Sequence, residues 1–250
     1  MTERKFGYVR DNFNPEDFDY RPKFRLFNLP KEVDLRAGID TIYDQGQTSS
    51  CVAHGIVAAF KYQRAKQGKS DLMPSRLFLY YNARKKRGWE GEDSGCMIRD
   101  GIKVSNKFGI CKEEHWAFNT ENILIKPNDP CYEEAEHFQS LEYYRIQQSD
   151  YDIRSVLADG HLIPIGLQLY ESFMSDETAT TGYVKMPIPH EKKIGGHCVA
   201  LAGYSMRSRT YIFLNSWGKS WGMAGIGIIP FDYVLNPQLS SDMWKINLTE

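Results

Sequence analysis

The sequence predicts an α+β protein built as two lobes, and three observations support this prediction. Residues 51–125 show mainly helical periodicity. Strand patterns dominate from about residue 140 onward. The helical segments therefore precede the strands, without the alternation that is typical of a parallel βαβ sheet. The 250 residues, 42% of them hydrophobic, suffice for one large domain or two fused lobes.

Three helices are expected in the first half of the chain, each ending in a glycine. Apolar residues gather on one face of CVAHGIVAAFKYQRAKQG, and two later segments repeat this design. A glycine just past the last turn commonly terminates a helix. The expected helices span residues 51–68, 75–88 and 98–109.

Four apolar segments in the second half are expected to be strands. They are LIPIGLQLY, GHCVALAGYS, TYIFLNS and GIGIIP, at residues 162–170, 196–205, 210–216 and 225–230. Short apolar runs of this kind, bounded by turn-forming residues, favour strands.

Residues 1–28 are rich in aromatic and charged side chains and show no clean period, so we expect an extended arm. An arm of this composition can cover apolar surface on the body of the protein. Its aromatic residues are Phe6, Tyr8, Phe13, Phe18, Tyr20, Phe24 and Phe27.

Charge and hydropathy exclude several classes of partner. The formal net charge is -1 and there is no basic stripe, so we expect no nucleic acid partner. No apolar run approaches the roughly 18 residues that a membrane helix needs. The start, MTERKFGYVRDNFN, lacks the apolar core of a secretory signal. We expect a monomer in the cytoplasm or another reducing compartment, with a virion or export into a host left open.

The five cysteines are too sparse for a disulfide scaffold and show no paired CxxC spacing for zinc. Their number is odd, so at least one is unpaired within the chain. Pairing of Cys111 with Cys131 stays open. Two Cys–His neighbours, at residues 51 and 54 and at 197 and 198, could in principle bind a metal, but a core position suits His54 better. We therefore expect no metal and no cofactor.

One cysteine stands where a polar loop is expected to become a helix, in YDQGQTSSCVAHG (residues 43–55). A helix N-terminus has unpaired amide groups and partial positive charge, which stabilise a thiolate at Cys51. Such a nucleophile needs a base, and the base needs an orienting group. His197 leads into an apolar strand and Asn215 ends the next one, so these two residues are the candidates.

Blocks of sequence around these residues resemble the papain-like cysteine peptidases. The blocks are LPKEVDLR (29–36), DQGQTSSC (44–51), GHCVALAGY (196–204) and NSWGKSWGMAGIG (215–227). They follow the family order over most of the chain, and the family's Cys-His-Asn arrangement with distant His and Asn is well known. The YDQGQ form, without tryptophan after the cysteine, is more similar to bacterial and large-virus members than to animal cathepsins.

The resemblance implies an α+β papain-like fold, with a helical left lobe, an antiparallel β-barrel-like right lobe and the active-site cleft between them. It implies a peptidase domain at residues 29–250. Within it, the helical lobe is expected at about 45–130, and the β lobe at about 131–235 together with 29–40. A C-terminal tail is expected at 236–250.

The resemblance also implies four catalytic residues. Cys51 is the expected nucleophile. His197 would share a proton with it, as a thiolate–imidazolium pair, and then protonate the leaving amine. Asn215 would accept a hydrogen bond from the other imidazole nitrogen. Gln45 would donate its side-chain amide to the oxyanion.

Five further positions are implied as substrate-binding residues. Gly195 and Gly196 would let a substrate backbone approach the histidine, and Trp217 would shield the histidine's hydrogen bond from water. Gly95 and Cys96 stand where the family has a Gly-Gly pair that receives the substrate backbone. The side chain of Cys96 is therefore expected at the cleft.

Two departures from the family pattern concern the residues before the nucleophile. Thr48 replaces a cysteine that is normally in a disulfide, and Asp93 stands where its partner is expected. Both ends of that disulfide are missing together, which fits a reducing compartment or an origin outside the lysosomal branch of the family. Val52 replaces an aromatic residue, which implies a thinner cleft wall.

The sequence thus predicts a cysteine endopeptidase that hydrolyses polypeptides through an acyl-enzyme intermediate. Two alternatives stay open: a catalytically silent papain-fold peptide-binding protein, and a Cys-His acyltransferase, although the latter usually has Asp as its third residue. The arm has two possible roles. It packs permanently on the body, or it crosses the active-site cleft and inhibits, as in a zymogen.

Overall fold

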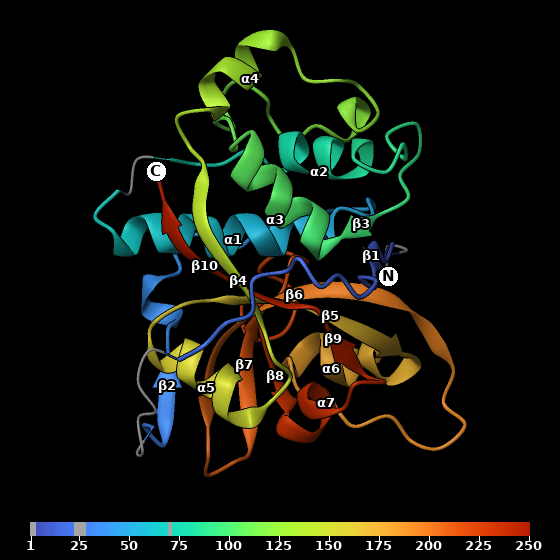
Figure 1. Ribbon diagram of the computed structural model, residues 1–250. Coiled ribbons are helices and arrows are strands. Elements are labelled where there is room, and N and C mark those ends of the chain that lie inside the picture. Colours follow the sequence, from blue (N-terminus) through green and yellow to red (C-terminus); the bar gives the residue numbers. More distant parts are fainter. Residues whose placement is uncertain (1–3, 23–28, 70–71) are drawn as a thin grey trace.

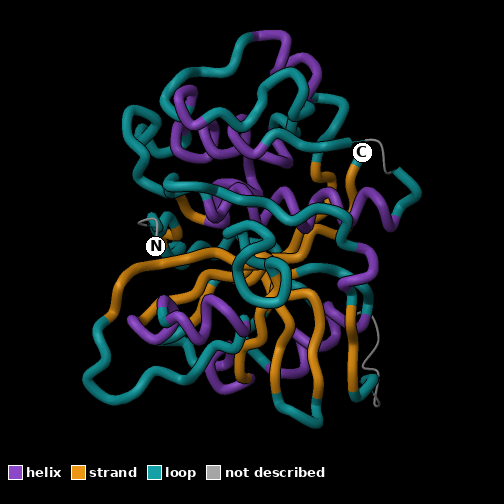
Figure 2. The backbone as a smooth tube through the Cα atoms, turned by 180° about the vertical axis from the view of Figure 1, so that it is seen from behind, coloured by secondary structure: helices purple, strands orange, loops and turns teal. Residues whose placement is uncertain are grey.

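The computed structural model describes residues 4–22, 29–69 and 72–250, and it has two lobes. Figure 1 shows helices gathered in the upper part and a twisted sheet with short helices below, with the described part of the arm running between them. Figure 2 shows the same division from behind, with most strands in the lower part. The predicted α+β two-lobe class is thereby confirmed.

The helical lobe contains α1 (Cys51–Lys66), α2 (Arg76–Lys85), α3 (Ile98–Lys107) and α4 (Asp129–Ala135). The first three are the helices that the sequence predicts, and a glycine in the left-handed region follows each of them, at positions 68, 88 and 109. The first ten residues of α1 are all buried because both lobes cover it, so its apolar residues are not confined to one face. Within the described ranges, no helix is both long and apolar enough to cross a membrane.

The β lobe is built on a six-stranded antiparallel sheet. Its strands are β2 (Glu32–Asp34), β5 (Ile163–Tyr170), β6 (Lys193–Ser205), β7 (Thr210–Leu214), β8 (Ile226–Pro230) and β9 (Ser240–Ser241). The order is β8-β7-β6-β5-β9, with β2 also pairing with β6, and in the described residues this path does not close into a barrel. The four predicted strands are all present. Three short helices of this lobe were not predicted: α5 (Asp150–Ala158), α6 (Asp176–Thr181) and α7 (Phe231–Leu235).

A two-stranded ribbon links the lobes and places their boundary differently from the sequence prediction. Strand β4 (Ser140–Ile146) pairs with β10 (Met243–Thr249), so residues expected as a C-terminal tail form a strand. Cys131 and Ala135 of α4 pack in the core of the helical lobe, where the prediction had assigned residues from 131 onward to the β lobe. Apolar burial against α2 and α3 explains this, because a boundary placed by sequence pattern does not see tertiary contacts.

Helix α1 packs against strand β6, and this contact sets the two lobes against each other. A Cβ atom added at Gly55 of α1 would lie only 2.9 Å from the Cys198 sulfur on β6, so the helix and strand approach closely. The core of the helical lobe accordingly includes Cys198 and Ala200 from the sheet. The N-terminal end of α1 therefore lies beside the middle of β6.

Candidate active site

The nucleophile candidate lies at the first residue of α1. Cys51 follows Ser50, whose side chain makes no capping hydrogen bond to the helix, so the first amides of α1 have no side-chain partner from this residue. The thiol is fully buried. Among the groups that favour its thiolate form is the backbone amide of Cys198, the residue next to His197. The fold therefore brings Cys51 beside the strand that carries the histidine.

The histidine and the asparagine are joined as the sequence predicts. His197 Nε2 lies 2.8 Å from Asn215 Oδ1, and both residues are buried. The Trp217 ring lies 4.7 Å from the imidazole, centroid to centroid, and covers this pair. Phe173 packs against both rings. His197 Nδ1, by contrast, has no hydrogen-bond partner among the described residues.

Gln45 is held in place by the asparagine block. Its backbone amide donates to the Ser216 carbonyl at 2.9 Å, and its Oε1 accepts from Ser216 Oγ at 2.7 Å. Because Oε1 is fixed in this way, Nε2 points the other way, where it donates to the Thr48 carbonyl at 2.7 Å and to the Lys5 carbonyl at 3.3 Å. The side-chain amide of Gln45, which is expected to donate to the oxyanion, thus donates to the Lys5 carbonyl of the arm.

The arm crosses the cleft between the lobes. Strand β1 (Tyr8–Val9) pairs in parallel with β3 (Cys96–Met97), and the Cys96 amide donates to the Gly7 carbonyl at 2.9 Å. Cys96 is buried at the cleft, beneath the arm. In Figure 1 the arm runs along the junction of the lobes, from the N-terminal label past β6.

Each of the five residues expected to bind substrate contacts the arm. Besides Cys96, an added Cβ at Gly95 would lie 2.1 Å from the Gly7 carbonyl oxygen, and one at Gly196 would lie 2.3 Å from that of Tyr8. A Cβ at Gly195 would lie 2.8 Å from the Phe6 ring. The Trp217 carbonyl accepts from Arg4, and the Trp217 ring lies 6.5 Å from that of Phe6.

With the arm in place, the predicted ion pair is not formed. Burial raises the pKa of the Cys51 thiol to about 11, although the backbone amides of Cys198 and Gly7 act in the opposite direction. Burial lowers the pKa of the His197 imidazole to about 4, against the effect of its hydrogen bond to Asn215. Both groups are therefore neutral at pH 7 in this arm-docked form, because water cannot solvate their charges.

Buried acidic groups fasten the arm beyond the cleft. The Asp11 carboxylate accepts from Arg145 Nη1 at 3.3 Å, and its backbone amide donates to Asp242 at 2.7 Å. Asp17 forms an ion pair with Arg99 at 2.8 Å. The side chains of the three aspartates are at most 3% exposed. This cluster, made of Asp11, Asp17, Arg99, Arg145 and Asp242, is called the charge cluster below.

The aromatic residues of the arm divide into two groups. Phe6, Tyr8 and Tyr20 pack against the body, as expected of an arm that covers apolar surface. Phe13 and Phe18 are largely exposed. Phe24 and Phe27 lie outside the described residues.

At the place where the resemblance to the papain-like peptidases implies a disulfide, this protein has hydrogen bonds to Asp93. Its carboxylate accepts from the Ser49 amide at 3.0 Å and from the Tyr80 hydroxyl at 2.7 Å. It also pairs with Lys5 of the arm at 3.0 Å. All five cysteines are free thiols, Cys111 and Cys131 included, although these two are close enough for a side-chain hydrogen bond.

Sequence reasoning did not identify the anchors of the arm on the body. Arg145 lies on β4 and Asp242 lies between β9 and β10, and no local motif marks either residue. The contact of Ser216 with Gln45 could have been predicted, since Ser216 belongs to the NSWG block of the sequence. The described residues contain no cluster of potential metal ligands.

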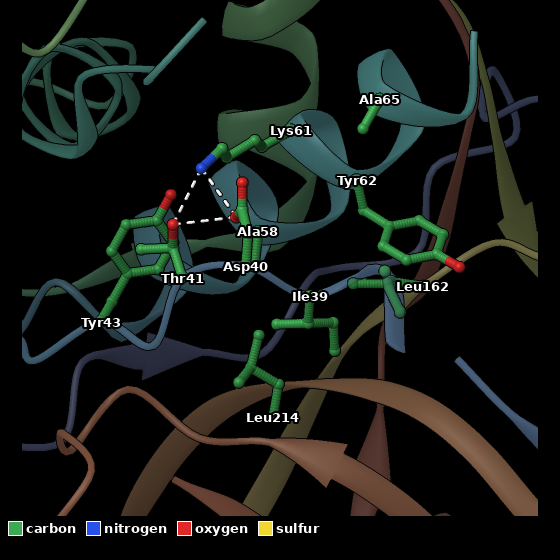
Figure 3. Close-up of a pocket in the computed structure, with 11 residues that line it drawn as sticks. Ile39, Asp40, Thr41, Tyr43, Ala58, Lys61, Tyr62, Ala65, Leu162 and Leu214 are labelled. Carbon is green, nitrogen blue, oxygen red and sulfur yellow. Dashed lines mark hydrogen bonds and ion pairs between the residues drawn. The ribbon is translucent and has the colours of Figure 1, made fainter. Parts of the chain in front are cut away.

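A separate pocket lies along α1, away from its N-terminus. Residues Ala58, Lys61, Tyr62 and Ala65 form one wall, and the segment around Asp40 forms the other (Figure 3). Lys61 Nζ closes it with hydrogen bonds of 2.8 Å to Asp40 and to Thr41. None of the candidate catalytic residues lines this pocket.

Comparisons with known proteins agree with this geometry. The family described as "Papain family cysteine protease" matches residues 29–230. An uncharacterized peptidase C1-like protein of Acanthamoeba polyphaga mimivirus is 37% identical over 270 residues, covering 97% of this chain and 86% of the relative. Human cathepsin L2 is 23% identical over 237 residues, covering 90% and 69%.

Among solved structures, xylellain, a cysteine protease from Xylella fastidiosa, superposes with a TM-score of 0.92 at 33% identity, over 100% of this chain and 99% of that one. The greater similarity to bacterial and large-virus proteins than to an animal cathepsin is thus as the sequence predicts. The family match over residues 29–230, with a 37% identical relative along nearly the whole chain, shows that this protein belongs to the papain family of cysteine proteases and is a hydrolase.

Proposed function

We propose that the protein is an endopeptidase that is inhibited by its own N-terminal arm until the arm is displaced or cut. The observation that carries this proposal is the position of the arm. It contacts all five predicted substrate-binding residues, and its Lys5 carbonyl accepts from Gln45. A polypeptide substrate needs the same positions, so the arm and the substrate exclude each other.

Departure of the arm would activate the thiol by admitting water. In the arm-docked form, burial holds Cys51 as a neutral thiol and His197 as a neutral imidazole. Without the arm, the proton passes from the Cys51 sulfur to His197 Nδ1, the nitrogen with no partner among the described residues. The Asn215 carbonyl oxygen then holds the protonated ring through Nε2.

The reaction would follow in two steps. The Cys51 sulfur attacks the scissile carbonyl carbon, and the oxygen takes up negative charge facing Gln45 Nε2 and the Cys51 amide. His197 gives its proton to the leaving nitrogen, the C–N bond breaks, and a thioester remains. A water molecule, deprotonated by His197, then attacks the thioester and releases the acid and the free thiol. One oxyanion donor typically contributes about 3 kcal/mol to lowering the barrier.

The test compares the full chain with a chain that begins at Leu29, where the family match starts. We expect the shorter chain to show a higher kcat/KM on a fluorogenic peptide, and to react faster at pH 7 with an epoxide thiol inhibitor. Labelling should be absent in Cys51→Ala. A shorter chain that is folded but no more active would show that the arm is permanent packing.

The same experiment addresses the alternative functions. A folded shorter chain whose Cys51 labels but which cleaves no peptide in a library would favour a peptide-binding protein. Transfer of the acyl group to an added amine in preference to water would favour an acyltransferase.

A further inference from the structure

The Tyr8 side chain of the arm enters a pocket of the β lobe whose wall is made by glycine. A Cβ atom added at Gly166 would lie 2.0 Å from the Tyr8 ring, and one at Gly196 would lie 3.0 Å from it. At the far end of the ring, the phenol oxygen lies 2.6 Å from Ser241 Oγ and donates to the Asp242 carboxylate. The pocket therefore has a flat wall that fits a ring and a polar floor that binds a hydroxyl.

The floor of this pocket is buried and held in a specific conformation. The Asp242 side chain is 1% exposed, and its φ of 58° lies in the left-handed region, which non-glycine residues adopt only when their surroundings impose it. Its Oδ1 accepts from Arg145 Nη2 at 2.6 Å. Its Oδ2 accepts from the Tyr8 hydroxyl and from the Asp11 amide. Both donors to Oδ2 belong to the arm.

Departure of the arm leaves this oxygen short of donors. Among the described residues outside the arm, Oδ2 also contacts Ser241 Oγ, at 3.5 Å. A substrate side chain that fills the pocket displaces water from Oδ2, so a side chain that supplies a donor in its place is favoured. Arg145 already neutralises the carboxylate, so a second cation gains less than in an unpaired acidic pocket. A phenol supplies the donor without adding charge, and burial beside Asp242 holds the pKa of Tyr8 far above its ordinary value, so this hydroxyl stays protonated.

We propose that Ser241 and Asp242 make this subsite selective for tyrosine in the substrate, over phenylalanine and over arginine. The proposal rests on the proposed function, since it takes Tyr8 of the inhibitory arm as occupying a substrate side chain's place. Tyr8 follows Gly7, whose amide reaches the Cys51 thiol, so the selected residue lies close to the cut bond. A site built to bind a hydroxyl rejects the analogue that lacks it, because the buried polar groups are then left unpaired.

The experiment measures kcat/KM for peptides that differ only by Tyr, Phe or Arg at one of the four positions before the cut. The enzyme is the full chain or its Gly7→Ala variant. The ratio of two kcat/KM values does not depend on how tightly the arm docks, because the arm must leave before either substrate binds. We expect Tyr to exceed Phe by about tenfold or more at one of these four positions, as for loss of a hydrogen bond to a charged group.

Ser241→Ala and Asp242→Asn should each bring the Tyr/Phe ratio toward one. Ser208→Ala and Asp232→Asn, at exposed positions, are the matched controls and should leave the ratio unchanged. Asparagine tolerates the left-handed conformation of position 242 as well as aspartate does.

Three results would each overturn this inference without contradicting the proposed peptidase function. They are equal cleavage of Tyr and Phe peptides, a preference for Arg, and a Tyr/Phe ratio that neither Ser241→Ala nor Asp242→Asn changes. Failure of all peptides together with absence of thiol labelling would overturn the proposed function instead.

Discussion

At the scale of single residues, Gly7 is the point on which docking of the arm depends most directly. A Cβ atom at this position would lie 1.7 Å from the Ser49 carbonyl oxygen, and this neighbour is backbone in the loop that leads into α1. A side chain at position 7 therefore requires either the arm or the nucleophile loop to move. The loop is tied to Asp93, so the arm is the part that gives way.

Gly7→Ala is accordingly expected to activate the full-length protein. Overpacking of this kind costs about 1–3 kcal/mol, so kcat/KM on a fluorogenic peptide should rise by about tenfold or more. Gly91→Ala is the matched control, because no atom lies within 4 Å of its Cβ position and its φ is ordinary. If both variants keep the activity of the unmodified chain, Gly7 does not govern access to the thiol.

At the scale of elements, the loop before α1 is tied to the segment before β3 through Asp93. This carboxylate joins the Ser49 amide, the Tyr80 hydroxyl on α2 and Lys5 of the arm. Hydrogen bonds at one carboxylate thus link the segments for which the sequence resemblance implied a disulfide. Unlike a disulfide, this link does not depend on an oxidising environment.

Asp93→Ala should destabilise the protein, since it leaves the Ser49 amide and the Tyr80 hydroxyl without this acceptor. We expect a loss of about 2 kcal/mol in the free energy of unfolding and a fall in Tm of about 4–8 °C, measured by thermal denaturation. Asp232→Ala serves as the comparison, because Asp232 forms only an exposed ion pair with Arg209. Identical melting of the two variants would show that Asp93 is not a structural link.

At the scale of the whole molecule, the charge cluster couples docking of the arm to pH. Burial and the neighbouring Asp242 carboxylate raise the pKa of Asp11 to about 7, although Arg99 and Arg145 oppose the shift. A free arm would have the ordinary value near 4. Docking therefore takes up a proton between these values, so the contribution of Asp11 is fully present below about pH 4 and is lost as the pH rises through about 7.

The inhibition is therefore expected to weaken from acid to neutral pH. The ratio of kcat/KM between the chain that begins at Leu29 and the unmodified chain should be largest near pH 4–5 and smaller at pH 8. The catalytic pair contributes little to this ratio, because one proton moves from His197 to Cys51 on docking without exchange with solvent. Asp11→Asn should make the ratio independent of pH. A ratio that rises with pH in the unmodified Asp11 background would contradict the coupling.

Much of this molecule follows from local patterns. The helices that start at Cys51, Arg76 and Ile98 and the strands around His197 could be predicted, because periodicity and terminal glycines act over a few residues. The hydrogen bond between His197 and Asn215 was also expected, since motif blocks in the family order carry that geometry. The helices α6 and α7, of six and five residues, were missed because they are too short to show a period.

The path of the arm and its anchors depend on contacts between residues far apart along the chain. Tyr8 meets Ser241 across 233 positions, and Asp11 meets Asp242 across 231. The sequence left two roles for the arm open, because aromatic composition indicates burial without saying against which surface. The protonation of Cys51 was decided in the same way. A helix N-terminus favours the thiolate, but burial of the thiol has the larger effect on its pKa, and burial exists only once the chain has folded.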